Sequence, residues 1–476
     1  MPIFNPKMSL SDIHNNLNLS FENKPSSFLK LLEKHIHFDS FIPESFKSDF
    51  YKSMGRKHIY ELDSFIRFFV LQNVLGIPSD IMLINILNLS NELRIFCRFH
   101  KVPDASQFSR FRTNYHANLA DMFRNLVNIT EPICRKINEK KAKYLIYDTS
   151  GIELPVKENN PKFLETKLNE AKKLSSTKKD SSDSSPYAIA YSRLPDFASA
   201  NPEARQQYIN GHFCYALKFG ILTNGLGIPR FVSFFDEDFK SAHPETAVKK
   251  TDNPDVDKEV ADAKSLKPVL TDFIAMHPKL EFKTFLADSA FDSYEIFAML
   301  RDSFKFSRVC IPINKRNTKL EPADFDEKGI PVCPLTKEPF IYQGIVHEKG
   351  RSDRIKWTCN KAKPFNKGKF VCDTPCTSSK YGRCVYTGVD KNFRLCPGIQ
   401  RDTEHWKNLY RHRVQIERTI NLIKDTFSVN YRKSYRTVSA KSNVYLAVIT
   451  QLIGVILADT IHQLKNFKSI RKLIAS

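Results

Sequence analysis

The first 140 residues show the apolar spacing of amphipathic helices. Leu62, Phe65, Phe68, Phe69, Leu71 and Leu75 recur at helical intervals. Gly76 and Pro78 end that segment, and Ser79 can cap a second, strongly apolar helix over 81–93. Residues 1–140 are therefore predicted to form a helical domain.

A further helical unit follows in the stretch VPDASQFSRFRTNY. Phe108, Phe111 and Tyr115 mark one face, while Arg110 and Arg112 project elsewhere. A short unit of this kind is compatible with a helix-turn-helix that reads DNA. A helical packing domain with surface arginines fits equally well, and the pattern leaves both open.

From residue 143 onward the apolar pattern becomes mixed. The expected elements are a strand at 144–147, a hairpin with strands at 212–222 and 228–235, a helix at 260–273, a strand at 282–287, a helix at 291–300 and a strand at 308–313. Residues 157–186 are rich in Lys, Ser and Asp and predict a solvated loop or flexible insert. Residues 314–404 predict a small β-rich insertion. Helices over 405–427 and 442–464 close the chain, so the pattern indicates a mixed α/β core in two parts, 141–313 and 405–476.

The composition argues against a disordered chain and against a membrane protein. Of the 476 residues, 41% are hydrophobic and 12% aromatic, which is enough for large cores. The longest apolar run, at 444–458, is too short to span a bilayer and suits a buried helix. The N-terminus lacks a signal-peptide pattern, so a cytoplasmic protein with reduced or metal-bound cysteines is expected.

The positive charge is concentrated in the last third of the chain. The whole chain carries a net charge of +21, of which residues 1–300 contribute +2 and residues 301–476 contribute +19. Such an excess favours a polyanionic partner, with nucleic acid first and an anionic membrane second.

Two aspartates follow short apolar strands. Asp148 ends YLIYD and Asp288 ends FLAD. Catalytic and binding groups of open α/β sheets gather at that edge, and two carboxylates that meet there repel unless a cation lies between them. Oxygen ligands favour Mg²⁺ or Mn²⁺. A turn or capping role is the alternative for either residue alone.

A third carboxylate lies on the closing helix. At about 100° per residue, Tyr410, Arg413, Glu417 and Lys424 fall within an arc of about 60°. An adjacent apolar stripe can pack on the sheet. The helix is therefore predicted to bury one stripe and to present these four side chains at the sheet edge.

This spacing resembles the Tyr-Arg-Glu-Lys signature of DDE transposases from bacterial insertion sequences. Asp148 and Asp288 fall where that family has its first two acids, and the β-rich insertion precedes the helix that bears Glu417. The N-terminal helical region is similar to the family's amino-terminal domain. The resemblance covers about residues 50–465.

The resemblance implies an RNase H-like catalytic core, a mixed five-stranded sheet with flanking helices, preceded by a helical DNA-binding or dimerisation domain. Asp148, Asp288 and Glu417 would hold two Mg²⁺ (or Mn²⁺) ions about 4 Å apart. Tyr410, Arg413 and Lys424 would grip DNA phosphates. The implied partners are double-stranded DNA, both transposon ends and target, and a second copy of the chain, in the bacterial cytoplasm.

Several weaker candidates remain. Lys218 and Asp292 are weaker candidates for the site, and a surface ion pair is the favoured account of each. Trp357 or Trp406 is placed to stack on a flipped base, with a packing role as the alternative.

The insertion contains six of the ten cysteines. Cys372, Cys376 and Cys384, with Cys359 or Cys396, have a spacing that fits a structural zinc site, and scattered reduced thiols are the alternative.

Three functions are consistent with these residues. The first is an active transposase that cuts DNA at terminal inverted repeats and transfers the strands to target DNA. The second is an inactive or domesticated transposase-derived DNA-binding protein. The third is an RNase H-like nuclease without strand transfer.

Overall fold

The N-terminal part of the protein is helical. The computed structural model describes residues 27–52, 58–177, 185–209, 212–247, 260–314, 325–326, 329–348, 354–362, 368–388, 393–394, 398–401 and 403–474. Its first elements are α2 (Ser27–His35), α3 (Phe38–Phe41), α4 (Glu44–Phe50), α5 (Leu62–Leu75), α6 (Asp80–Leu89), α7 (Asn91–Phe96), α8 (Ala105–Asn114) and α9 (His116–Ala142). Phenylalanines join them, as where Phe68 stacks on Phe108 with ring centroids 3.7 Å apart. The predicted helical region is confirmed for the described residues.

A mixed sheet forms the centre of the molecule. Its strands are β1 (Tyr144–Glu153), β2 (Phe197–Ala198), β3 (Asn201–Ile209), β4 (His212–Asn224), β5 (Pro229–Phe234), β6 (Thr284–Leu286) and β7 (Arg308–Cys310). The order is β2-β3-β4-β1-β6-β7, and β5 also pairs with β4. β1 is antiparallel to β4 and parallel to β6, which is parallel to β7. In the part of the chain that the structure describes, the sheet has seven strands where five were expected, because β2 and β3 extend it beyond the predicted hairpin.

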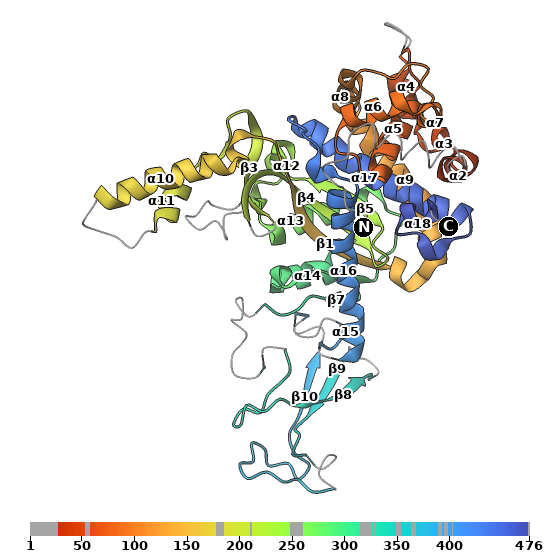
Figure 1. Cartoon of the computed structure of the whole chain (residues 1–476). Coiled ribbons are helices and arrows are strands. Elements are labelled where there is room, and N and C mark those ends of the chain that lie inside the picture. The colour runs from red at the N-terminus through yellow and green to blue at the C-terminus, as the bar shows by residue number, and fades with distance from the viewer. Residues whose placement is uncertain are drawn as a thin grey trace.

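Helices cover both faces of this sheet. On one face lie α9, α16 (Val414–Asn421) and the long apolar helix α17 (Thr437–Thr460), which share one core with the N-terminal helices. On the other face, α13 (Asp262–Met276) and α14 (Tyr294–Asp302) pack over a second core. The N-terminal helices therefore belong to the same packed body as the closing helices (Figure 1).

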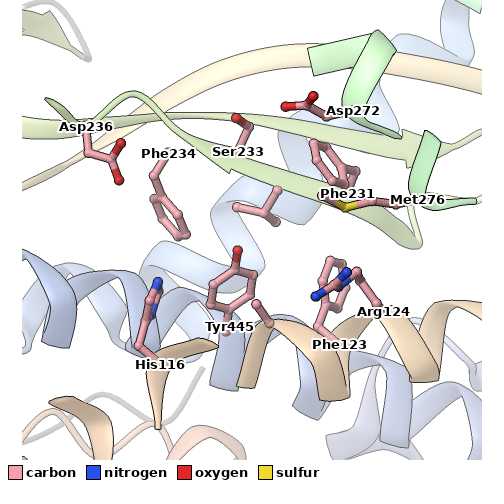
Figure 2. A pocket seen from close by; sticks show the side chains of 12 residues that line it. His116, Phe123, Arg124, Phe231, Ser233, Phe234, Asp236, Asp272, Met276 and Tyr445 are labelled. Carbon is pink, nitrogen blue, oxygen red and sulfur yellow. The ribbon is translucent and has the colours of Figure 1, made fainter. Parts of the chain in front are cut away.

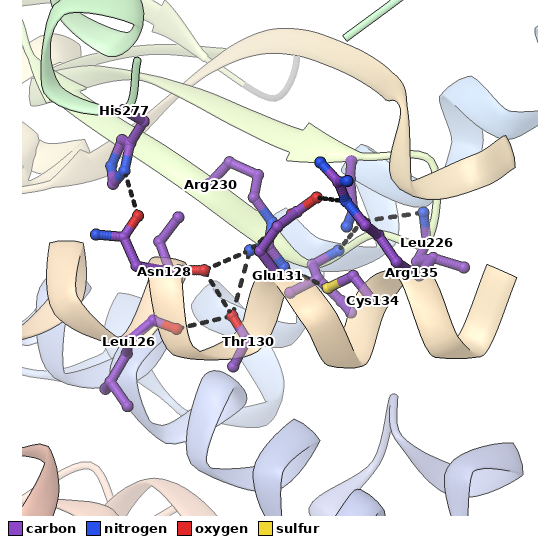
Figure 3. A network of polar contacts seen from close by, with 12 residues as sticks. Leu126, Asn128, Thr130, Glu131, Cys134, Arg135, Leu226, Arg230 and His277 are labelled. Carbon is purple, nitrogen blue, oxygen red and sulfur yellow. Dashed lines mark hydrogen bonds and ion pairs between the residues drawn. The ribbon is translucent and has the colours of Figure 1, made fainter. Parts of the chain in front are cut away.

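A buried polar network fixes α9 to the sheet (Figure 3). Arg230, on β5, is completely buried and donates to the Val127 carbonyl at 3.0 Å and to the Cys134 sulfur at 2.6 Å. His277 bonds Asn128 at 3.0 Å, so the end of α13 is tied to the same helix. Buried polar groups require such partners, and the network sets the position of α9.

Two segments leave the central body (Figure 1). The first is a pair of helices, α10 (Pro161–Thr177) and α11 (Pro186–Ser192), which pack on each other. The prediction of a solvated loop over 157–186 is thus wrong for 161–177, where leucines at helical spacing outweigh the charged composition. The second is the insertion, with β8 (Ile341–Val346), β9 (Arg354–Thr358) and β10 (Cys384–Gly388) in an antiparallel sheet of order β10-β9-β8.

The closing helical segment is continuous but irregular. It consists of α15 (Glu404–Tyr410), a 3₁₀ turn over Arg411–Arg413, α16 and a π-helical turn over Leu422–Thr426, and after α17 the short α18 (Ile470–Ile474) ends the described chain. By length and composition, α17 could cross a membrane, but 89% of its most apolar stretch is buried inside the protein. This agrees with the predicted buried helix.

Candidate active site

Asp148 lies in the middle of β1. The prediction that the strand ends there is wrong, because β4 pairs with β1 as far as Glu153. The parallel neighbour β6 ends at Leu286, before Asp288, and Leu286 pairs with Ile146 of β1. Continued by two residues, that register brings Asp148 level with Asp288. The two acids therefore stand side by side where β6 stops.

Backbone amides hold the two aspartates. The Asp148 carboxylate accepts from the Thr149 N–H at 2.9 Å. Asp288 caps the 3₁₀ turn Ser289–Phe291 and accepts from the Ala290 N–H at 2.8 Å. Such local hydrogen bonds orient a carboxylate before any ligand arrives.

All three predicted acids contact one guanidinium. Arg413 donates to Glu417 at 2.5 Å through Nη1. Its Nη2 lies 3.5 Å from an Asp148 oxygen and 3.7 Å from an Asp288 oxygen. The sheet edge and the closing helix thus bring the three carboxylates around a single positive charge.

The electrostatics reflect this crowding. Burial raises the pKa of Asp148 to about 6, with Arg413 opposing the shift and Asp288 adding to it. Burial alone would lower the pKa of Arg413, but the surrounding carboxylates raise it. Burial, and then the same acids, raise the pKa of Tyr410 to about 12. The site therefore favours a bound cation.

The donor set fits a hard divalent metal ion. Asp148, Asp288 and Glu417 offer only oxygens, which Mg²⁺ and Mn²⁺ prefer. Across the described ranges, no three His, Cys, Asp or Glu side chains already lie close enough to hold one ion. Since Arg413 lies among the acids, a metal ion held by all three would require the acids to come closer together and the Arg413 side chain to move away.

The other two signature residues lie beside the acids. Tyr410, at the end of α15, stacks on Trp406 with ring centroids 4.8 Å apart. Lys424 is buried and lies 3.3 Å from the Ser150 hydroxyl. Ser150 is two residues from Asp148 and so on the same face of β1. Burial lowers the pKa of Lys424.

Lys218 and Arg112 do not reach an open surface. Lys218 is buried, ion-paired with Asp262 and bonded to the Val260 carbonyl at 2.8 Å. It pairs with Gly151 across the sheet, which puts it on the face opposite Asp148. Arg112 is also buried, in an ion pair with Asp80. The prediction that Lys218 and Arg112 contact DNA is therefore wrong, because each side chain forms a buried ion pair. Arg110, in contrast, is exposed.

Trp357 and Asp292 are structural as well. Trp357 is 1% exposed in the core of the insertion, so the prediction that it stacks on a base is wrong. Asp292 is buried and accepts from the Arg394 side chain at 2.8 and 2.5 Å. It also accepts from the Asn314 N–H at 2.7 Å. Both ends of the insertion are therefore tied to one carboxylate, four residues after Asp288.

The cysteines divide into two groups. Cys359, Cys372 and Cys376 lie near Cys333 at one end of the small sheet, whereas Cys384 is exposed on β10. Cys396 lies outside the described residues. Burial would raise the pKa of Cys333, but hydrogen bonds from Thr336 and Leu335 lower it to about 7.

Sequence reasoning missed the contacts that position α16. Gly227, in the turn between β4 and β5, has φ of 78°, and its carbonyl accepts from Thr419 at 2.7 Å and from Gln451 at 3.0 Å. A β-carbon at Gly227 would stand 3.2 Å from Gln415 and Thr419. The Asn-Gly-x-Gly turn was a visible signal for a hairpin, but not for its docking on this helix.

A pocket of about 250 Å³ lies elsewhere, between α9, β5, α13 and α17 (Figure 2). His116, Arg124, Asp236, Asp272 and Tyr445 are among the residues that line it. No residue of the acid cluster lines this pocket, so it is separate from the candidate active site.

Family models identify the class of protein. A model described as "Transposase domain (DUF772)" matches residues 18–114, and one described as "Transposase DDE domain" matches residues 252–453, which include Asp288 and Glu417. No curated protein matches the chain. Among solved structures, it is similar to a piggyBac transposase in a synaptic complex with hairpin DNA, at 11% identity and a TM-score of 0.37 over 95% of this chain and 80% of that one.

The two family models together match more than half of the chain and agree with each other. The protein is thus an enzyme of DNA transposition. It belongs to the DDE transposases of the insertion-sequence type. This family generally uses divalent metal ions, which agrees with the all-oxygen donor set.

Proposed function

We propose that the protein cuts DNA at the terminal inverted repeats of its element and joins the freed ends to target DNA, with Asp148, Asp288 and Glu417 as the catalytic acids. The contact of all three acids with the Arg413 guanidinium carries this proposal. The strand order β5-β4-β1-β6-β7 within the larger sheet, with β4 the antiparallel member beside β1, supports an RNase H-like core.

The acids would hold two Mg²⁺ or Mn²⁺ ions. Bound ions of this kind activate water or a 3′-hydroxyl and neutralise charge on the leaving oxygen. Asp148 and Asp288 enter the reaction already oriented by the N–H groups of Thr149 and Ala290. Arg413, displaced from the acids, pairs with a DNA phosphate, for which its planar fork is suited. Lys424 and Tyr410 also lie beside the acids and position the DNA backbone.

Double-stranded DNA is the proposed partner. Residues 301–476 carry the +19 charge, and this part of the chain includes the insertion and the helix of Glu417. A homodimer in the bacterial cytoplasm, synapsing two element ends, completes the proposal.

The test is a cleavage and strand-transfer assay. Purified protein is incubated with Mg²⁺, a labelled DNA fragment that carries the element's end, and a supercoiled target plasmid. Wild-type protein should nick the fragment and join it to the plasmid. Asp288→Ala and Glu417→Gln should abolish both steps and still bind the fragment in a gel-shift assay, because neither acid is needed to hold DNA.

Glu404→Gln is the matched control, since Glu404 is an exposed carboxylate on the same helical segment and pairs only with Lys407 among the contacts described. It should retain activity. Cleavage by Asp288→Ala would refute the assignment of the acids. Nicking without joining would favour a nuclease, and DNA binding without nicking by wild-type protein would favour an inactive, transposase-derived DNA-binding protein.

A further inference from the structure

The insertion has a small core for its length. Among its described residues, the hydrophobic core cluster consists of Cys333, Phe340, Ile355, Trp357, Cys359 and Ala362. Three short strands over such a core bury little apolar area, and small domains of this kind commonly depend on a metal ion or on disulfides. The described cysteines are free thiols, so a disulfide does not supply this support.

Two tight turns bring cysteines to one end of the sheet. The Lys337 N–H bonds the Cys333 carbonyl at 2.9 Å, which closes the first turn. The Ala362 N–H bonds the Cys359 carbonyl at 3.0 Å and closes the second. Asn360 donates to Glu338 at 3.0 Å, so the two turns lie against each other.

Two further cysteines are tied to the same place. The Val371 N–H bonds the Lys361 carbonyl at 3.2 Å, which brings Cys372 to the second turn. Arg383 donates to the Cys376 carbonyl at 3.3 Å, and the Arg383 carbonyl accepts from the Cys359 N–H at 3.0 Å. Cys376 also packs against the core of the insertion.

The turns point amide hydrogens at sulfur. The backbone N–H groups of Leu335 and Thr336 bond the Cys333 thiol, and that of Lys361 bonds the Cys359 thiol. The Cys376 thiol hydrogen-bonds the Cys333 sulfur. Amide donors of this kind are the outer contacts that metal-binding cysteines use. They lower the pKa of Cys333, whereas burial raises the pKa of Cys359 and of Cys376.

We infer that Cys333, Cys359, Cys372 and Cys376 form a structural zinc site that holds the end of the insertion together. Four thiolates suit tetrahedral Zn²⁺. Among the described residues, no three of these thiols already lie close enough to hold one ion, so the site would have to close on the metal. Cys372 and Cys376 lie in a segment without regular structure, so their side chains can move inward on the ion.

This set revises the one expected from cysteine spacing. Cys333 replaces Cys384, which is exposed on β10 and does not join the group. Spacing alone did not reveal Cys333, because 25 residues separate it from Cys359 and only the fold brings the two turns together.

The experiment is metal analysis of the full-length protein purified from zinc-supplemented cells. Wild-type protein and the control Cys384→Ser should each contain one zinc per chain. Cys333→Ser and Cys376→Ser should lose most of it, because three thiolates hold zinc much more weakly than four. Trypsin should then cut these variants between 333 and 376 before it cuts the rest of the chain.

A second measurement does not depend on the folding of the variants. Co²⁺ added to metal-free wild-type protein should give thiolate charge-transfer absorption and the intense visible bands of a tetrahedral site, and Zn²⁺ should abolish both. Absence of these bands, iron in place of zinc, a Cys333–Cys376 disulfide found by thiol titration, or equal zinc loss in Cys384→Ser would each overturn the inference. None of these readouts requires transposase activity.

Discussion

At the scale of single residues, the candidate site is a balance of charge around Arg413. Its guanidinium is within 3.7 Å of an oxygen from each of the three acids, and its side chain is only 18% exposed. Asp148 is shielded from solvent nearly as well as Arg413, whereas Glu417 is exposed, and in the metal-free protein Arg413 limits the mutual repulsion of the acids.

Removal of this charge should change how the protein responds to metal. In the absence of metal, the free energy of unfolding of Arg413→Ala should be about 1–3 kcal/mol lower than that of wild type, because a partly buried ion pair is broken. Addition of Mg²⁺ should stabilise the variant more than wild type, since no guanidinium has to be displaced. Urea denaturation in EDTA and in Mg²⁺ measures both.

Arg411→Ala is the control, because Arg411 is exposed two residues away and bonds Asn408 at 2.8 Å. It should leave the response to Mg²⁺ as in wild type. An equal Mg²⁺ effect in wild type and Arg413→Ala would contradict the proposed displacement.

Asp148 should make the metal-free protein less stable as pH rises. Burial raises its pKa from the ordinary value of 3.8 to about 6. Between these values the folded chain binds the proton more tightly than the unfolded chain, so the free energy of unfolding falls as pH increases through this range. Asp148→Asn avoids the cost of burying a charged carboxylate. In EDTA it should be more stable than wild type by up to about 3 kcal/mol at pH of about 7.

The comparison is made by denaturant titration at several pH values. The difference between Asp148→Asn and wild type should shrink toward zero below pH of about 4, where both side chains are neutral. A difference that stays constant across this range would show that the Asp148 pKa is not raised.

At the scale of elements, the position of Glu417 depends on a turn that is distant in sequence. Thr419, half a helical turn beyond Glu417, and Gln451 on α17 both donate to the Gly227 carbonyl. The β4–β5 turn, α16 and α17 are thereby locked together at one backbone oxygen. This contact holds Glu417 in position relative to Asp148 and Asp288.

Gly227→Ala should disturb catalysis more than stability. The positive φ alone costs about 1–2 kcal/mol for alanine. In addition, the new methyl group meets Gln415 and Thr419 at 3.2 Å and should push α16 away from the sheet. We expect a cleavage rate at least about tenfold lower, because small displacements of catalytic groups are costly.

Gly368→Ala is the matched control. Gly368 has a similar φ of 80°, and a β-carbon there meets nothing within 4 Å. Gly368→Ala should be destabilised by the positive φ and should retain the wild-type cleavage rate. Equal rates for the two variants would argue against positioning through Gly227.

At the scale of the whole molecule, α17 joins the N-terminal helices to the catalytic sheet. It packs against α5, α8 and α9 as well as β5. Asn73 on α5 donates to the Leu446 carbonyl at 3.0 Å and to Thr450 at 2.7 Å. The expected boundary near residue 140 therefore separates segments of sequence that share one hydrophobic core.

A chain that begins at Lys143 should fail to fold. It would expose the apolar surface of α17 that α5, α8 and α9 cover, and exposed patches of this kind cause aggregation. Replacement of residues 161–192 by a short linker should be tolerated, because α10 and α11 pack mainly on each other. Soluble yield and circular dichroism of the two proteins provide the comparison, and a soluble, helical 143–476 chain would refute the shared core.

Sequence patterns predicted those elements of the fold that depend on residues close to one another in the sequence. The hairpin at Asn224-Gly225, the apolar strands and the buried closing helix follow from spacing and turn chemistry. The extension of β1 through Asp-Thr-Ser-Gly was not predictable, because its partner β4 and not its own residues stabilises it. Helical arithmetic grouped the four signature residues, but it did not predict the π-helical turn in which Lys424 lies or the burial of that side chain.

The clamp at Asp292 has a mechanical consequence. Because Asn314 and Arg394 both bond this one side chain, the beginning and the end of the insertion are held together on the core, four residues after Asp288. We expect any displacement of the insertion to act first on this contact, and through it on the neighbouring loop of Asp288.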